Sequence, residues 1–224
     1  FVLRFQQITG PVMAKGLEDT SFYIYNRLLS LNEVGGNPLY FGCSLDDFHH
    51  HNLERNRKWP FGLIATSTHD TKRSEDARLR LSVLSEEPES WKINISKWAV
   101  VNEKHKTLLG NSLEPRKNTE YFIYQTLLSA WPDEAMDEKS YGVLRTRLEQ
   151  YVIKAAREAK VYTNWTNPDS TYEDAIKKFI YGILSQDESN AFLDLFQPVQ
   201  KKNSLLGKLN SFSATVLKMG SPGV

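Results

Sequence analysis

The residues best suited to chemistry stand together in residues 62–76, whose sequence reads GLIATSTHDTKRSED. The apolar run at residues 63–65 predicts a short buried strand, and the Ser-Glu-Asp at 74–76 predicts the first turn of a helix. In α/β folds, ligands bind where the carboxyl end of a strand meets the next helix. A carboxylate, an imidazole, an ammonium and a guanidinium stand at that point: Asp70, His69, Lys72 and Arg73.

Asp70 and His69 are candidates for binding a polyhydroxylated ligand. A carboxylate can hold a pair of hydroxyls or stabilise positive charge on a sugar ring, and an imidazole can donate to a further hydroxyl. Alternatively, Asp70 caps the following turn and His69 is a structural hydrogen-bond donor. The spacing alone leaves both interpretations open.

Two further groups of polar residues accompany this pair. Lys72 and Arg73 could anchor a polar ligand, or they could be a solvated entry to the helix. Lys15, Glu18 and Asp19 could form a second polar rim near Asp70, or they could belong to a loop and a first helical turn. The residue types do not decide between these alternatives.

The sequence predicts neither a cofactor nor a metal. His49, His50 and His51 are adjacent, so on a helix they point in different directions and do not converge on one ion. No glycine-rich phosphate loop, paired-cysteine motif or nucleophile elbow occurs. Of the five tryptophans, Trp59 and Trp165 lie beside turns and are the better candidates for stacking on a sugar.

The composition excludes several classes of function. The 224 residues carry 28 basic and 27 acidic side chains, so no strong field favours nucleic acid or an anionic membrane. No apolar run approaches the ~20 residues that span a bilayer. The single cysteine, Cys43, fits a reducing compartment, and we expect a cytoplasmic protein. Because the chain opens on Phe1 without an initiator methionine, we expect it to be a piece of a longer protein.

Periodicity and capping residues give a coarse order of elements. Two short strands are predicted at residues 1–8 and 63–66. Helices are predicted over 17–31, 45–57, 75–84, 89–106, 120–130, 139–160, 172–184, 187–199 and 205–219. The pattern is that of a mainly α chain with a few short strands, either an α/β piece with a helical insertion or a helical domain with β remnants.

Several motifs resemble the maltooligosyltrehalose synthase family of the α-amylase superfamily. They run through nearly the whole chain, and the long His-Asp motif with its Lys-Arg tail is the most specific. The matching segments are RFQQ at 4–7, GPVMAKGLEDT at 10–20, LNEVGG at 31–36, STHDTKRSED at 67–76, YQTLL at 124–128, KAAREAK at 154–160 and SPGV at 221–224.

The resemblance implies a fragment of a (β/α)8 catalytic barrel with a helical insertion. Residues 1–73 would be late strands and helices of the barrel, residues 74–204 a helical subdomain, and residues 205–224 a helix leading into the last barrel strand. The implied activity converts the reducing-end α-1,4 linkage of a maltooligosaccharide into an α,α-1,1 linkage, giving a maltooligosyl trehalose. Its chemistry resembles that of retaining glycosidases.

Carried over residue by residue, the resemblance makes Asp70 the third catalytic carboxylate, which stabilises the transition state, and makes His69 a binder of a neighbouring hydroxyl. Lys72 and Arg73 would line the acceptor side, and Lys15 and Glu18 would help to retain the reducing-end glucose. The Gly-x-Arg-x-Asp motif of the nucleophile is not present in this chain. We therefore expect the nucleophile and the acid/base to lie in the remainder of the parent barrel and the isolated chain to be inactive.

Two other functions fit the same residues. An α-amylase-type hydrolase would use water as the acceptor, although the Lys72-Arg73 tail and the loop around Lys15 argue against it. A non-catalytic helical binding or scaffold module would need Asp70 only as a cap and the tryptophans only as core.

Overall fold

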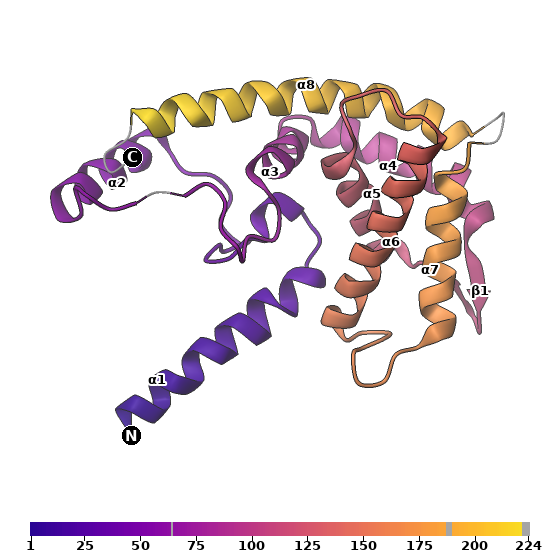
Figure 1. Ribbon diagram of the computed structural model, residues 1–224, viewed down its shortest axis with the longest axis horizontal. Coiled ribbons are helices and arrows are strands. Elements are labelled where there is room, and N and C mark those ends of the chain that lie inside the picture. Colours follow the sequence, from indigo (N-terminus) through magenta and orange to yellow (C-terminus); the bar gives the residue numbers. More distant parts are fainter. Residues whose placement is uncertain (64, 187–189, 221–224) are drawn as a thin grey trace.

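Helices with apolar residues at helical spacing make up most of the chain (Figure 1). The computed structural model describes residues 1–63, 65–186 and 190–220. The mainly α class predicted from the sequence is confirmed. The α-helices are α1 (Val2–Pro11), α2 (Leu45–Lys58), α3 (Glu75–Ser82), α4 (Pro88–Asn102), α5 (Lys117–Ala130), α6 (Glu138–Ala159), α7 (Ser170–Ile183) and α8 (Ala191–Met219). Short η helices lie at Val12–Glu18, Ser21–Tyr23, Leu29–Leu31, Val83–Ser85 and Glu103–His105.

An aromatic cluster forms the centre of the core. Trp98 on α4 is fully buried, and its ring centroid lies 5.3 Å from that of Trp91, 5.4 Å from Tyr124 on α5 and 5.3 Å from Phe196 on α8. Aromatic side chains bury more apolar area than any others, so this cluster holds three helices together. We call residues 75–207, which contain it, the helical body.

A β-hairpin that the sequence reading did not predict joins α4 to α5. Strand β1 (Thr107–Leu109) pairs antiparallel with β2 (Ser112–Glu114), with Thr107 opposite Glu114. Gly110 turns the chain at a φ of 59°, a conformation that glycine adopts without steric cost. The Gly110-Asn111 pair is the sequence signal that predicts such a turn.

Helix α8 is one continuous helix where the sequence predicted two, over 187–199 and 205–219. Phe192 and Phe196 are buried in the body, and this packing offsets the hydrogen bond that Pro198 cannot donate. Further along, Gly207 lies against Arg80 of α3: a Cβ added to Gly207 would be 2.9 Å from the Arg80 Cα atom. The proposed domain boundary at residue 204 therefore falls inside a helix, and the division into domains stays a prediction.

The strand predicted at residues 1–8 is wrong, because this segment is helix α1. Val, Ile and Phe favour strands only weakly, so their presence does not decide the structure. Phe1, Phe5, Ile8 and Val12 recur at intervals of four, three and four residues, which is the spacing of a helix and not of a strand. No residue of α1 is buried, so the helix lies apart from the core (Figure 1).

The long helix predicted over residues 17–31 is also wrong. The segment begins with the last two residues of a π-helix, Val12–Glu18, and contains two single 3-10 turns, Ser21–Tyr23 and Leu29–Leu31. Side-chain amides replace the missing helical hydrogen bonds. Gln125 on α5 accepts from Leu29 N (2.9 Å) and donates to Asn26 O (2.8 Å), and the Asn32 amide donates to Phe22 O (2.9 Å). Buried backbone groups need partners, and here distant residues supply them.

The second predicted strand, residues 63–66, does not form among the described residues. Leu63 is 96% exposed, and residues 65 and 66 have no regular structure. Ile64 lies outside the described residues. The Thr66 carbonyl accepts from the Arg78 guanidinium, and no strand of the described residues lies beside this apolar run to form a ladder with it.

Three segments, which we call the outer segments, bury none of their described residues: 1–18, 37–63 and 208–219. The C-terminal half of α8 reaches over the side on which α2 lies (Figure 1). Helix α2 itself is confirmed, with the Ser44 side chain accepting from Asp47 N (3.0 Å). In the part of the chain that the structure describes, no helix is both long and apolar enough to cross a membrane.

Candidate functional site

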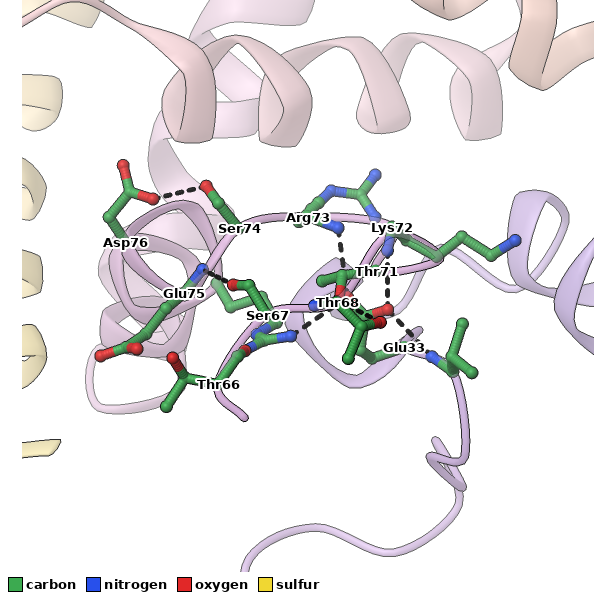
Figure 2. A network of polar contacts seen from close by, with 12 residues as sticks. Glu33, Thr66, Ser67, Thr68, Thr71, Lys72, Arg73, Ser74, Glu75 and Asp76 are labelled. Carbon is green, nitrogen blue, oxygen red and sulfur yellow. Dashed lines mark hydrogen bonds and ion pairs between the residues drawn. The ribbon is translucent and has the colours of Figure 1, made fainter. Parts of the chain in front are cut away.

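The loop that carries Asp70 is a tight turn closed by two threonines (Figure 2). The Thr71 hydroxyl accepts from Thr68 N (2.6 Å), and Thr71 N donates to Thr68 O (3.2 Å). On the helix side, the Ser67 hydroxyl accepts from Glu75 N (3.3 Å), which ties the loop to the first turn of α3. These contacts fix both ends of the loop and leave its tip, residues 69 and 70, projecting.

The Glu33 carboxylate anchors the loop to the segment before it (Figure 2). It accepts from Lys72 N (2.7 Å) and Arg73 N (3.1 Å), and it pairs with the Arg78 guanidinium (3.4 Å). Two backbone amides and a cation on one half-buried carboxylate form charge-assisted hydrogen bonds, the stronger kind. Glu33 therefore sets the position of Asp70 relative to the body.

Asp70 and His69 both face solvent. Their side chains are 72% and 91% exposed, and His69 Nε2 lies 3.3 Å from Asp70 Oδ2. Within residues 1–63, 65–186 and 190–220, no backbone N–H donates to the Asp70 carboxylate. The turn is closed instead by Thr71, so these residues do not place Asp70 in the role of a cap.

Asp19 joins two of the predicted ligand-binding cations. Its carboxylate oxygens lie 2.5 Å from Lys15 Nζ and 2.7 Å from Lys72 Nζ. Hydrogen bonds from these two ammonium groups lower the pKa of Asp19 below its usual value of 3.8. The same contact raises the pKa of Lys15 above its usual value.

Glu18 links the π-helix to the loop that carries Glu33. Its Oε1 atom accepts a hydrogen bond from Gly35 N (3.1 Å). Lys15, Glu18 and Lys72 are therefore brought together around the Asp70 loop, by Asp19 and Glu33.

Arg73 lies apart from this group. Only its backbone N–H meets Glu33, while the side chain extends toward the helices of the body (Figure 2). The residue is 8% exposed, and its Cζ atom lies 5.8 Å from the ring centroids of both Phe122 on α5 and Tyr151 on α6. The structure therefore does not bring the Arg73 guanidinium beside Asp70.

Sequence reasoning did not single out Glu33, and it treated Asp19 only as part of a rim. A carboxylate followed by Val-Gly-Gly in a loop signals neither catalysis nor a cap, so Glu33 could be found only by its match to the LNEVGG motif. The residues that the structure describes contain no group of three or more His, Cys, Asp or Glu able to hold a metal ion.

The fold and the loop define a helical segment with an exposed carboxylate on a loop that also carries Lys72, which Asp19 links to Lys15. Comparison with known proteins shows what this segment resembles. No family model matches the chain. A Mycobacterium tuberculosis protein provisionally named maltooligosyl trehalose synthase is 36% identical over 222 residues, which is 99% of this chain and 27% of that protein.

Solved structures agree with that comparison. The maltooligosyltrehalose synthase from Arthrobacter ramosus superposes with a TM-score of 0.83 at 34% identity, covering 100% of this chain and 26% of that one. A hypothetical maltooligosyl trehalose synthase from Sulfolobus tokodaii gives 0.83 at 38% identity, covering 100% of this chain and 29% of its own. The resemblance is confirmed: sequence and fold are those of one stretch of the maltooligosyl trehalose synthases. The chain spans 27% of the length of the curated relatives it matches.

Proposed function

We propose that this chain is part of an intramolecular glucosyltransferase, of the (1→4)-α-D-glucan 1-α-D-glucosylmutase type, that makes maltooligosyl trehalose. The observation that carries the proposal is the exposed Asp70 carboxylate on the Glu33-anchored loop, two residues before Lys72, whose ammonium group shares the Asp19 carboxylate with Lys15. The chain's similarity to maltooligosyl trehalose synthases supplies the reaction. A cytoplasmic role in trehalose biosynthesis follows as part of the proposal.

In this reaction the bond between C1 of the penultimate glucose and O4 of the reducing-end glucose breaks. The same C1 then bonds to O1 of the released glucose, and the proton of O1 passes to O4, so no water is consumed. Asp70 would stabilise the positive charge that develops on the sugar ring, and His69 would donate to an adjacent hydroxyl. Both side chains are exposed and free to meet a sugar.

The two lysines would retain the released glucose. Lys72 is 13% exposed and held by Asp19, whereas Lys15 is 74% exposed and shares the same carboxylate. Ammonium groups fixed in this way donate to sugar hydroxyls without first losing side-chain freedom. Holding the glucose in place raises its effective concentration above that of water, which favours transfer over hydrolysis.

The nucleophile and the acid/base would come from the remainder of the parent barrel, which is the partner we propose for this chain. The outer segments support this. They expose large apolar side chains that a folded protein ordinarily covers, among them Phe5, Trp59, Phe61 and Phe212 at 58%, 71%, 95% and 71%. An apolar surface of this extent fits coverage by more protein.

Counting reducing ends tests the proposal. Glucosyl transfer to O1 removes the reducing end of the maltooligosaccharide, whereas hydrolysis creates a new one. We expect reducing ends to fall when the full-length protein containing this chain acts on maltopentaose, and to stay constant with the isolated 224-residue chain. A rise would show an α-amylase-type hydrolase.

The scaffold alternative predicts a different result. If the full-length protein leaves reducing ends unchanged, while a maltooligosyl trehalose synthase of known activity lowers them in the same buffer, the chain is a non-catalytic module and the proposal fails.

A further inference from the structure

A cleft of about 980 Å³ lies between α3, α5 and α6, on the side of the body to which the Arg73 side chain extends. Its walls combine apolar side chains such as Met136 and Val143 with the polar groups described below. Asp70 and His69 do not line it. The cleft is thus separate from the candidate catalytic loop, although Lys72 and Arg73 stand where the loop meets the cleft.

Three buried polar atoms of residues that line this cleft have no hydrogen-bond partner in the part of the chain that the structure describes: Arg73 Nη2, Thr126 Oγ1 and the Tyr151 hydroxyl. Arg73 and Thr126 are 8% and 6% exposed. Thr126 stands one helical turn after Phe122, whose ring stacks on Tyr151 at 5.9 Å and contacts the Arg73 guanidinium. The three residues therefore lie around Phe122, in the same part of the cleft.

A buried guanidinium without an anion is unusual. The salt bridges of the described residues pair Arg78, Arg80, Arg116 and Arg157 with carboxylates, but none of them includes Arg73. Removing a cation from water without a partner is unfavourable, and two aromatic ring faces compensate only part of this. Leaving two buried hydroxyls unpaired as well adds to the cost.

The charges around the cleft favour an anion. Arg147 and Lys139 line it and are exposed, and no hydrogen bond or ion pair within the described residues engages either side chain. Two of the acidic residues are already engaged: Asp133 pairs with Arg80 (2.8 Å), and Asp137 caps α6 by accepting from Ser140 N (2.8 Å). Of the other two acids, Asp76 accepts from the Ser74 hydroxyl, and Glu134 has no partner among the described residues, so the free cations at Arg73, Arg147 and Lys139 outnumber the free carboxylate.

We propose that this cleft binds a small organic anion, with its carboxylate or phosphate group on Arg73, Thr126 and Tyr151. A guanidinium fork and two hydroxyls are suited to an oxyanion. A volume of about 980 Å³ is far larger than one oxyanion needs, so the apolar wall at Met136 and Val143 would receive the organic part of the ligand.

Isothermal titration of the 224-residue chain with phenyl phosphate, at constant ionic strength, tests this site. We expect saturable 1:1 binding of phenyl phosphate, weaker binding of inorganic phosphate and no binding of uncharged benzyl alcohol. The absence of saturable binding by phenyl phosphate, or equal binding of benzyl alcohol, would overturn the proposal.

Variants locate the site without disturbing the fold. Thr126→Val and Tyr151→Phe remove hydroxyls that have no partner, so we expect each to leave the free chain at least as stable while weakening phenyl phosphate binding about tenfold. Arg73→Lys, which loses the fork, should weaken it at least as much. Unchanged affinity in the two hydroxyl variants would contradict the site.

A matched pair on α6 provides the control. Arg147→Gln removes a cation that lines the cleft, whereas Arg145→Gln removes one that lies over the Tyr181 ring of α7 (4.5 Å to its centroid). We expect weaker binding only for Arg147→Gln, and equal effects of the two would contradict the proposal. Asp70→Asn should leave phenyl phosphate binding unchanged, because Asp70 does not line the cleft.

Discussion

The helical body and the outer segments differ in what their apolar residues contact. In the body, Trp98 and Phe196 are fully buried and lie ring against ring. In the outer segments, side chains of the same kind, such as Phe5 and Phe212, are mostly exposed. The helices of both regions satisfy their backbone hydrogen bonds, so the difference is one of tertiary partners. The body therefore has a packed aromatic core, whereas the described residues of the outer segments have none.

The largest expected effect is a difference in the free energy of unfolding between matched aromatic substitutions in the body and in an outer segment. We expect Trp98→Ala to lower the free energy of unfolding of the chain by about 3–5 kcal/mol, because it empties the centre of the aromatic cluster. Phe212→Ala, the matched aromatic change on the outer half of α8, should cost less than about 0.5 kcal/mol. Urea denaturation measures both. Equal losses would show that the outer half of α8 is held as firmly as the body.

Two carboxylates with lowered pKa values make the second comparison. Glu173 in the body is buried and accepts from Arg157 Nε and Nη2 (2.7 and 2.6 Å) and from the Thr163 hydroxyl (2.7 Å). These hydrogen bonds lower its pKa below the usual 4.5, as Lys15 and Lys72 do for Asp19. A carboxylate whose pKa is lower in the folded chain than in the unfolded chain stabilises the fold at pH values above its unfolded pKa. This stabilisation is lost as the pH falls below that unfolded pKa and through the folded one.

We therefore expect Glu173→Gln to cost about 2–3 kcal/mol at pH 7 and to remove part of the stability loss seen as the pH falls below 4.5. Asp19→Asn should affect stability much less, and only the pH range below 3.8. Denaturation midpoints between pH 3 and pH 7 measure both effects. If Asp19→Asn removed more of the stability loss at low pH than Glu173→Gln does, the comparison would be reversed.

The smallest expected effect on the free energy of unfolding comes from a change next to the loop that carries Asp70. Glu33→Gln replaces the carboxylate that accepts from the Lys72 and Arg73 amides. We expect these two amides to exchange with solvent about tenfold faster, a loss of about 1.4 kcal/mol in local opening, while the body keeps its protection. Amide hydrogen exchange resolved by residue measures this. Uniformly faster exchange across α4 and α5 would mean that Glu33 supports the body and not the loop.

The sequence predicted the elements whose signals are local. Helix α2 follows its cap residue Ser44, and α6 follows its stripe of Leu144, Leu148 and Val152. Residues 1–8 were misread because β-favouring residue types were given more weight than their helical spacing. Residues 17–31 were misread because Gln125, almost a hundred residues later, supplies hydrogen bonds that no local pattern can indicate.

The same distinction applies to the candidate site. The His-Asp motif located Asp70 and the neighbouring Lys72 from their order in the chain. The partners that position them, Glu33 and Asp19, are 39 and 53 residues from Lys72 along the chain and are brought there only by folding. The burial of Arg73 between two rings was likewise invisible, because the rings belong to α5 and α6.

The most direct test of the account is an activity measurement on the full-length protein that carries Asp70→Asn. The quantity measured is the rate at which this variant removes reducing ends from maltopentaose. We expect that rate to fall by about a hundredfold or more, with an unchanged melting temperature, because the carboxylate is exposed and, among the described residues, pairs only with His69. Wild-type protein from the same preparation is the control. A rate within threefold of the wild type would contradict the assignment of Asp70 to catalysis.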